Sequence, residues 1–103
     1  MDIAELQDNA TAASDLLKVM ANESRLLILC NLIGGEKSVN ELEQLVGLRQ
    51  SALSQHLAVL RRERLVKTRR EAQYIYYSLD SDEAKTIMGA LHQVFCQGKP
   101  ACG

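Results

Sequence analysis

Long apolar stretches are absent from this sequence of 103 residues, and so is a cationic opening. A helix that spans a bilayer needs about 20 consecutive apolar residues, and a secretory signal places basic residues before its apolar core. The sequence begins instead with the acidic stretch Met1-Asp2-Ile3-Ala4-Glu5. We therefore expect a cytoplasmic protein, of a length suited to one domain.

Cysteine, histidine and proline are also scarce. Three cysteines are an odd number, so a disulfide framework is not expected and reduced thiols are the default. With two histidines, no paired acids in an apolar context and no glycine loop for phosphate, the sequence indicates neither an enzyme nor a bound cofactor. The one proline, Pro100, lies in 98–103, which we predict to be a flexible tail after a single domain over 1–97.

The net charge of −1 conceals a strong asymmetry along the chain. The segment from Arg49 to Arg70 has seven basic residues and one acidic residue, whereas the remainder is acidic overall. Such a distribution suits a protein that presents one face to a polyanion. Because a charged cluster alone is also typical of a solvated surface, its interpretation depends on the segment that precedes it.

Two helices are predicted in the first third of the chain. Apolar residues recur at intervals of three and four from Ile3 to Met20, which indicates one amphipathic helix. Asn22 is a suitable N-cap for a second helix, which should end at Gly34 and Gly35. That second helix is apolar nearly all round, so we expect it to be central and buried.

A helix-turn-helix is predicted next. The capping box Ser38-Val39-Asn40-Glu41 begins a short third helix that Gly47 closes. A fourth helix follows, in which Leu53, Leu57 and Leu60 are spaced to lie on one inward face. In such a pair of helices the second is the one that reads DNA.

After the fourth helix, the period changes from helical to alternating. In residues 74–79 the side chains alternate between two faces, as in a strand, and Val66–Arg70 is a suitable partner strand. We therefore predict a hairpin with Glu71-Ala72 near its tip. Its tyrosines are expected to pack in the sheet. Asp80, with Glu83 three residues later, is expected to cap a last helix. The architecture is thus mainly α: four helices, a hairpin and a fifth helix.

The exposed face of the fourth helix carries uncharged hydrogen-bonding groups that can reach base edges in the major groove. The predicted base-reading residues are Gln50, Ser51, Ser54, Gln55 and His56. His56 is equally consistent with a semi-buried histidine that bonds the scaffold. Cations around the base readers can hold phosphates. The predicted phosphate-binding residues are Arg49, Arg61, Arg62, Arg64, Lys67, Arg69 and Arg70.

Three separated stretches resemble the ArsR family of repressors. The stretch from Ser51 to Arg61 is similar to that family's recognition helix, Ala21–Leu26 to the start of its second helix, and Arg69–Leu79 to its wing. The resemblance covers residues 14–96. It implies a winged helix-turn-helix, a homodimer through the first and last helices, and a palindromic operator in double-stranded DNA. Arg49 departs from the family, which often has a small polar cap there, so a phosphate contact suits it better.

The resemblance also suggests an inducer. The third helix lacks the paired cysteines of the family's arsenic and cadmium sensors, and the last helix has only His92 where zinc sensors have several ligands. Cys30 and Cys96 instead resemble the two cysteines of the sulfide- and persulfide-responsive branch (BigR, SqrR and HlyU). There, a reactive sulfur species links the two thiols within one subunit and DNA affinity falls. The resemblance implies a repressor induced by reactive sulfur species or oxidants.

Several alternatives stay open at this point. A lone buried cysteine is most often a small apolar core residue, and Cys102 is then an incidental thiol. A metal-responsive repressor could use Cys30, Cys96, His92 or Cys102, because His92 and Cys96 lie one helical turn apart. The chain could also be an anti-repressor or a constitutive DNA-binding regulator, or use a winged fold to dock a protein partner without DNA.

Overall fold

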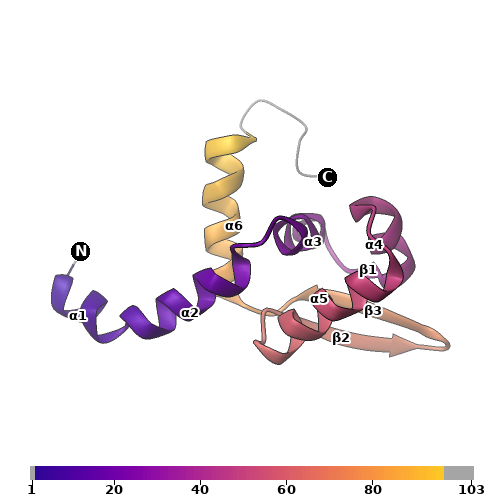
Figure 1. Ribbon diagram of the computed structural model, residues 1–103, viewed down its shortest axis with the longest axis horizontal. Coiled ribbons are helices and arrows are strands. Elements are labelled where there is room, and N and C mark those ends of the chain that lie inside the picture. Colours follow the sequence, from indigo (N-terminus) through magenta and orange to yellow (C-terminus); the bar gives the residue numbers. More distant parts are fainter. Residues whose placement is uncertain (1, 97–103) are drawn as a thin grey trace.

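A computed structural model describes residues 2–96. Its elements are α1 (Ile3–Asp8), α2 (Ala10–Met20), α3 (Glu23–Ile33), β1 (Lys37–Ser38), α4 (Val39–Val46), α5 (Gln50–Arg62), β2 (Val66–Glu71), β3 (Tyr74–Leu79) and α6 (Asp82–Phe95). Helices α1 and α2 extend from one end of the molecule, the β2–β3 hairpin reaches the other, and α6 stands away from the body (Figure 1). The predicted mainly α order is confirmed. The predicted tail, with Pro100 and Cys102, lies outside the described residues.

Helix α3 is the centre of the fold, as its apolar sequence predicts. It begins where the Asn22 side chain accepts a hydrogen bond from the backbone N–H of Arg25 (3.1 Å) and ends at Gly34. It packs against α2, α4, α5, α6 and β3. Its fully buried Ile28 and Leu29 belong to a single hydrophobic core.

The predicted capping box at the start of α4 is present in full. The Ser38 hydroxyl accepts from the Glu41 N–H (3.1 Å), and the Glu41 carboxylate accepts from the Ser38 N–H (3.0 Å). The hydrogen bond from the backbone N–H of Ser38, followed by the contact with its hydroxyl, lowers the pKa of the Glu41 carboxyl below its usual value. Gly47 ends the helix in the left-handed conformation (φ 75°), which costs glycine little. Both ends of α4 are therefore fixed by local sequence.

The Ser38→Ala substitution should lower the free energy of unfolding by about 1 kcal/mol, because it leaves a backbone N–H of α4 without its acceptor. Urea denaturation of the full chain measures this directly. Asn40→Ala, an exposed residue in the same helix turn, is the matched control and should not destabilise the fold. Equal stabilities of Ser38→Ala and the parent protein would contradict a stabilising cap.

Helix α5 lies against this core through the three predicted leucines, Leu53, Leu57 and Leu60, none of them more than 1% exposed. The hairpin follows, and its sheet has the antiparallel order β1-β3-β2. Tyr76 of β3 is opposite Ser38 on one side and Arg69 on the other. No helix within residues 2–96 has the length and apolarity needed to cross a membrane.

The single N-terminal helix predicted over Ile3–Met20 is wrong in one respect. Asn9 interrupts it, with φ −105° and ψ 7°, and its side chain donates back to the carbonyl of Glu5 (2.8 Å). Asparagine competes for backbone hydrogen bonds in this way, so the apolar period can continue across a break. Helix α1 contains no buried residue, and so no packing opposes the interruption.

The hairpin turns at Ala72-Gln73, directly after the last pair Glu71–Tyr74, so the prediction that Glu71-Ala72 lies near its tip is confirmed. The predicted cap of the last helix is wrong. Ser81, rather than Asp80, caps α6: its hydroxyl accepts from the Ala84 N–H (3.0 Å). Strand β1 was not predicted, because two residues are too few to show a period.

Candidate nucleic-acid interface and thiol pocket

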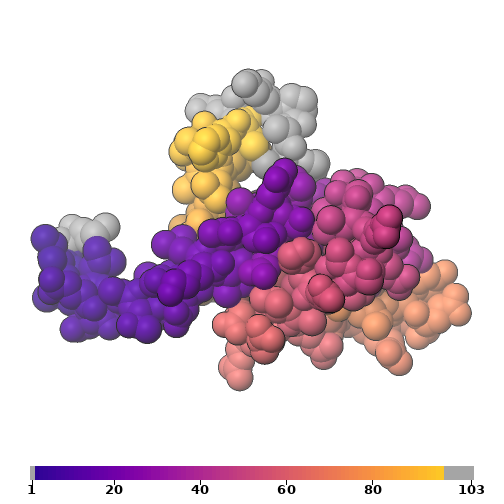
Figure 2. Space-filling view, in the orientation of Figure 1, coloured from indigo at the N-terminus to yellow at the C-terminus, as the bar shows by residue number. Residues whose placement is uncertain are grey.

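The predicted base-reading face of α5 is exposed opposite its buried leucines. Gln50, Ser51, Ser54 and Gln55 are all exposed, as helical geometry requires once Leu53 points inward. Figure 2 shows α5 and the hairpin together on the lower side of the body, away from α6. The exposed groups and the hairpin are thus available to one extended partner.

A groove of about 850 Å³ separates α5 from the hairpin. The predicted residues Gln50, Ser54, Arg61 and Arg62 line one side of it. Asn40, Gln73 and Tyr74 also line it, and sequence reasoning assigned none of them to this site. Asn40 could have been found as a polar residue in the first turn of α4, the helix that precedes the recognition helix α5. Tyr74, by contrast, was predicted to pack in the sheet.

His56 lies at the edge of this face and is half-buried. Its Nδ1 accepts a hydrogen bond from Arg25 Nε (3.3 Å), and the same guanidinium donates to the Val19 carbonyl (3.1 Å). The ring is therefore bonded to the scaffold, which is the alternative that the sequence left open. A base contact by His56 stays a prediction that would have to use Nε2.

The predicted phosphate-binding cations differ in what already surrounds them. Arg62 contacts Glu63 (3.4 Å) and is largely exposed. Within the described part of the chain, the following make no side-chain hydrogen bond or ion pair, and all are exposed: Arg49, Arg61, Arg64, Lys67 and Arg70. Arg49 precedes α5 in extended conformation and gives it no side-chain cap. Of these cations, Arg61 and Arg62 line the groove together with Gln50 and Ser54.

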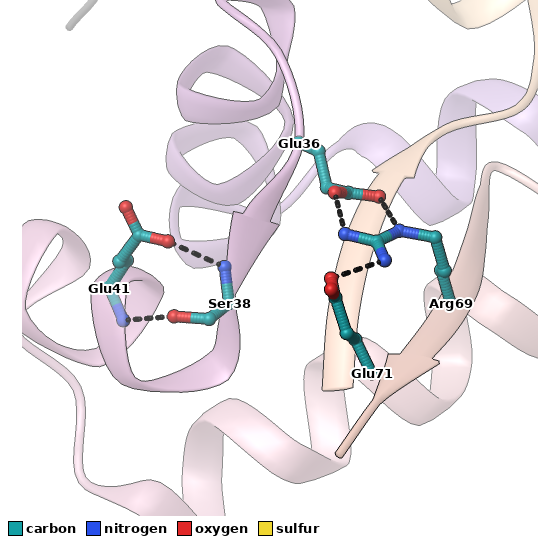
Figure 3. A network of polar contacts seen from close by, with 5 residues as sticks. All are labelled: Glu36, Ser38, Glu41, Arg69 and Glu71. Carbon is teal, nitrogen blue, oxygen red and sulfur yellow. Dashed lines mark hydrogen bonds and ion pairs between the residues drawn. The ribbon is translucent and has the colours of Figure 1, made fainter. Parts of the chain in front are cut away.

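Arg69 is the exception among the predicted phosphate contacts. Its guanidinium donates twice to Glu36 (Nε to Oε2, 3.1 Å; Nη2 to Oε1, 2.7 Å) and once to Glu71 (Nη1 to Oε2, 2.7 Å). It also lies 4.7 Å from the centre of the Tyr76 ring. Figure 3 shows the guanidinium between the two carboxylates, beside the Ser38–Glu41 capping box.

The two predicted sensing cysteines line the same cavity. Cys30 of α3 and Cys96, just after α6, are each 7% exposed and border an apolar cavity of about 480 Å³. Leu26, Leu27, Met88, Leu91 and Phe95 supply most of its remaining wall. Residues far apart in the sequence are thus brought to one small-molecule-sized space.

His92, which the metal alternative requires, lines this cavity as well. Across residues 2–96, however, no three histidine, cysteine or acidic side chains gather closely enough to hold a metal ion. The fourth residue of that alternative, Cys102, lies outside the described residues. Within the described region, the cavity brings together two thiols, one imidazole and an apolar wall.

Large apolar side chains remain exposed on the projecting helices. They are Ile3, Leu6 and Leu17 on α1 and α2, and Val94 and Phe95 on α6, with exposed fractions from 48% to 72%. Scattered exposed apolar residues are normal and others lie on α3, α4 and β3, but these five lie on three helices, α1, α2 and α6, that project from the body (Figure 1). Within one protomer, nothing among residues 2–96 covers them.

Comparison with known proteins gives consistent matches. The family model described as "Bacterial regulatory protein, arsR family" matches residues 22–68. The chain is 53% identical to the transcriptional activator HlyU of Vibrio cholerae, covering 94% of this chain and 90% of that protein. It is 44% identical to the biofilm growth-associated repressor of Agrobacterium fabrum (93% and 86% covered). The crystal structure of the transcriptional repressor BigR from Xylella fastidiosa superposes with a TM-score of 0.89 at 40% identity (93% and 98% covered).

Proposed function

This chain belongs to the ArsR family of bacterial regulatory proteins, and from that premise we propose a homodimeric repressor that leaves its operator when Cys30 and Cys96 become linked. The family resemblance seen in the sequence is confirmed, and so is the expectation of a transcriptional regulator rather than an enzyme. The dimer, the operator contacts and the thiol switch are the proposed parts.

In the proposed complex, α5 occupies the major groove and the hairpin lies along the adjoining backbone. Gln55 and Ser54 support base reading, because both are exposed on the face opposite the core. The exposed cations at the ends of α5 and on the hairpin support phosphate binding. They divide into Arg49, Arg61 and Arg64 around α5, and Lys67 and Arg70 on β2.

The exposed apolar side chains of α1, α2 and α6 support the homodimer. A chain of this size has a small core, so burying such a face against a second copy adds substantially to its stability. A two-fold dimer places two α5 helices symmetrically, and the corresponding operator is a palindrome with half-sites about one DNA turn apart.

The observation that carries the proposed switch is the shared apolar cavity of Cys30 and Cys96. Each thiolate attacks the outer sulfur of a hydropersulfide, takes that sulfur atom and releases the donor's thiolate. One cysteine persulfide then attacks the inner sulfur of the other. This step forms a trisulfide and expels hydrogen sulfide, so no further oxidant is needed.

A link of this kind ties α6 to the central helix α3. If α6 contributes to the dimer interface, fixing its position selects one arrangement of the two subunits and of their α5 helices. Release of DNA requires that the linked protein bind the operator more weakly by about 1–3 kcal/mol. That is within the range that one conformational constraint supplies.

One relative is named an activator and another a repressor, and binding to DNA at a promoter accounts for both names. A protein that occupies DNA represses directly when it excludes the polymerase, and activates when it displaces another repressor. For this chain we propose repression, with the anti-repressor role as the alternative that differs only in the arrangement of the promoter.

A gel shift tests the proposal with a duplex that the reduced protein itself selects from a random-sequence library. Reduced protein should bind the duplex as a dimer, a hydropersulfide should release it, and dithiothreitol should restore binding. Intact mass should show one added sulfur atom and the loss of two hydrogens per chain. Failure of the reduced protein to select any duplex would refute the DNA proposal, and selection without release would refute the switch alone.

A further inference from the structure

We infer that Arg69 anchors the hairpin instead of contacting phosphate, and that Glu36 is the positioning residue that holds it against the end of α3. The inference rests on the proposed function, in which the hairpin meets DNA beside α5. It replaces the sequence-based expectation that Arg69 binds phosphate.

The contacts of Arg69 fix its guanidinium from three directions. Glu36 receives two parallel hydrogen bonds from it, the fork geometry in which an arginine and a carboxylate fit best. Glu71 accepts from a second edge, and the Tyr76 ring lies 4.7 Å away. A phosphate could not take the same edges without displacing both carboxylates, whereas the neighbouring Arg70 has no such partner among residues 2–96.

The local charge also argues against a phosphate at this position. Two carboxylates surround one guanidinium, so the cluster is net negative and repels a DNA backbone. The hydrogen bond from Arg69 lowers the pKa of Glu36, and the bonds to both acids raise the pKa of Arg69. These shifts hold Glu36 and Arg69 in their charged forms. By contrast, Lys67 and Arg70 have no acidic partner among the described residues.

The order of the strands shows which parts of the fold the Arg69–Glu36 ion pair connects. Glu36 follows α3 and precedes β1, but Arg69 lies on β2, the strand on the far side of β3. The ion pair thus spans the sheet across Tyr76, which is paired with both Ser38 and Arg69. The hairpin also joins the body through the two-residue β1, through its buried base, and through packing of β3 on α3 and α4 and of β2 on α5. The ion pair adds the tie between β2 and the segment after α3, and in this inference it sets the angle at which the outer part of the hairpin reaches DNA.

Glu36→Gln separates the two roles by the sign of its effect. The substitution removes a negative charge near DNA, so electrostatics alone would tighten binding and steepen its salt dependence. A positioning role predicts the opposite: affinity of the reduced protein for its selected, fluorescein-labelled duplex should fall about three- to tenfold, with no steeper salt slope. Glu63→Gln, which also removes an exposed acid beside the DNA-facing cations, is the control and should bind slightly more tightly.

Unchanged or tighter binding by Glu36→Gln would overturn the inference. If the unsubstituted protein bound no duplex, the proposed function and this inference would fall together. If it bound but Glu36→Gln were not weaker, only the inference would fall. Circular dichroism checks that each variant is folded at the assay temperature.

A charge exchange provides a second test that does not depend on the single variant. It uses Glu71→Gln as the background, so that a carboxylate introduced at position 69 does not face Glu71. Arg69→Glu should weaken binding more than about tenfold in that background, and adding Glu36→Arg should restore it to within about threefold. Restoration is expected only if the pair itself matters, because a phosphate contact by Arg69 would stay lost. Failure of Glu36→Arg to restore binding would overturn the inference.

Discussion

Replacing Ser54 and Gln55 together with alanine should weaken binding of the selected duplex by roughly 30- to 700-fold, which corresponds to about 2–4 kcal/mol. The two side chains lie on the exposed face of α5, where hydrogen bonds to base edges would form. Binding to unrelated duplex should change little, since phosphate contacts supply it. Fluorescence anisotropy with both duplexes at one salt concentration measures the ratio.

Thr11→Ala combined with Gln93→Ala is the matched control for this prediction. Both residues are exposed and polar; Thr11 lies on the side of α2 away from Ala10, Ala13 and Leu17, and Gln93 lies on α6, away from the hairpin (Figure 1). The control should bind both duplexes as the parent protein does. Equal losses on selected and unrelated DNA would contradict base reading by α5 and indicate that its polar face only supports backbone contacts.

Cys30→Ser and Cys96→Ser should each abolish the response to a hydropersulfide. In the unsubstituted protein the treatment should lower DNA affinity by roughly 5- to 150-fold, and in either variant it should change little. One remaining thiol can still accept a sulfur atom, but it cannot form the link between α3 and α6. Titration of the duplex before and after treatment gives both affinities for each protein.

Cys102→Ser is the control, because the proposed link does not use that thiol. It should respond fully. Serine is close to cysteine in size, and thermal melts show whether either buried position tolerates it. A full response in Cys30→Ser would exclude the proposed pair, and loss of response in Cys102→Ser would assign the chemistry to a different pair of thiols.

Much of the fold could be predicted because its boundaries have local causes. The Ser38–Glu41 box and Gly47 define α4 through contacts within a few residues, and the leucine spacing of α5 fixes its inward face. The break at Asn9 and the cap at Ser81 could not be distinguished from their neighbours. At each position, two adjacent residues can make similar local hydrogen bonds, and only the three-dimensional context selects between them.

In the candidate site, too, only the features with local causes could be predicted. The polar face of α5 follows from helical geometry, and so does its separation from the core. The role of Arg69 does not, because its main partner, Glu36, lies 33 residues earlier and is brought near by the turn after α3. A count of basic residues treats Arg69 and Arg70 alike, whereas the structure neutralises one and leaves the other without a partner in the described region.

The short helix α1, without a single buried residue, has a consequence for gene dosage. Six residues are too few to hold a helix by their own hydrogen bonds, so in the proposed dimer its order comes from the second subunit. Mass action then makes folding and pairing one equilibrium. At low copy number, promoter occupancy would rise with roughly the square of the amount of protein. Small changes in synthesis would therefore produce larger changes in transcription.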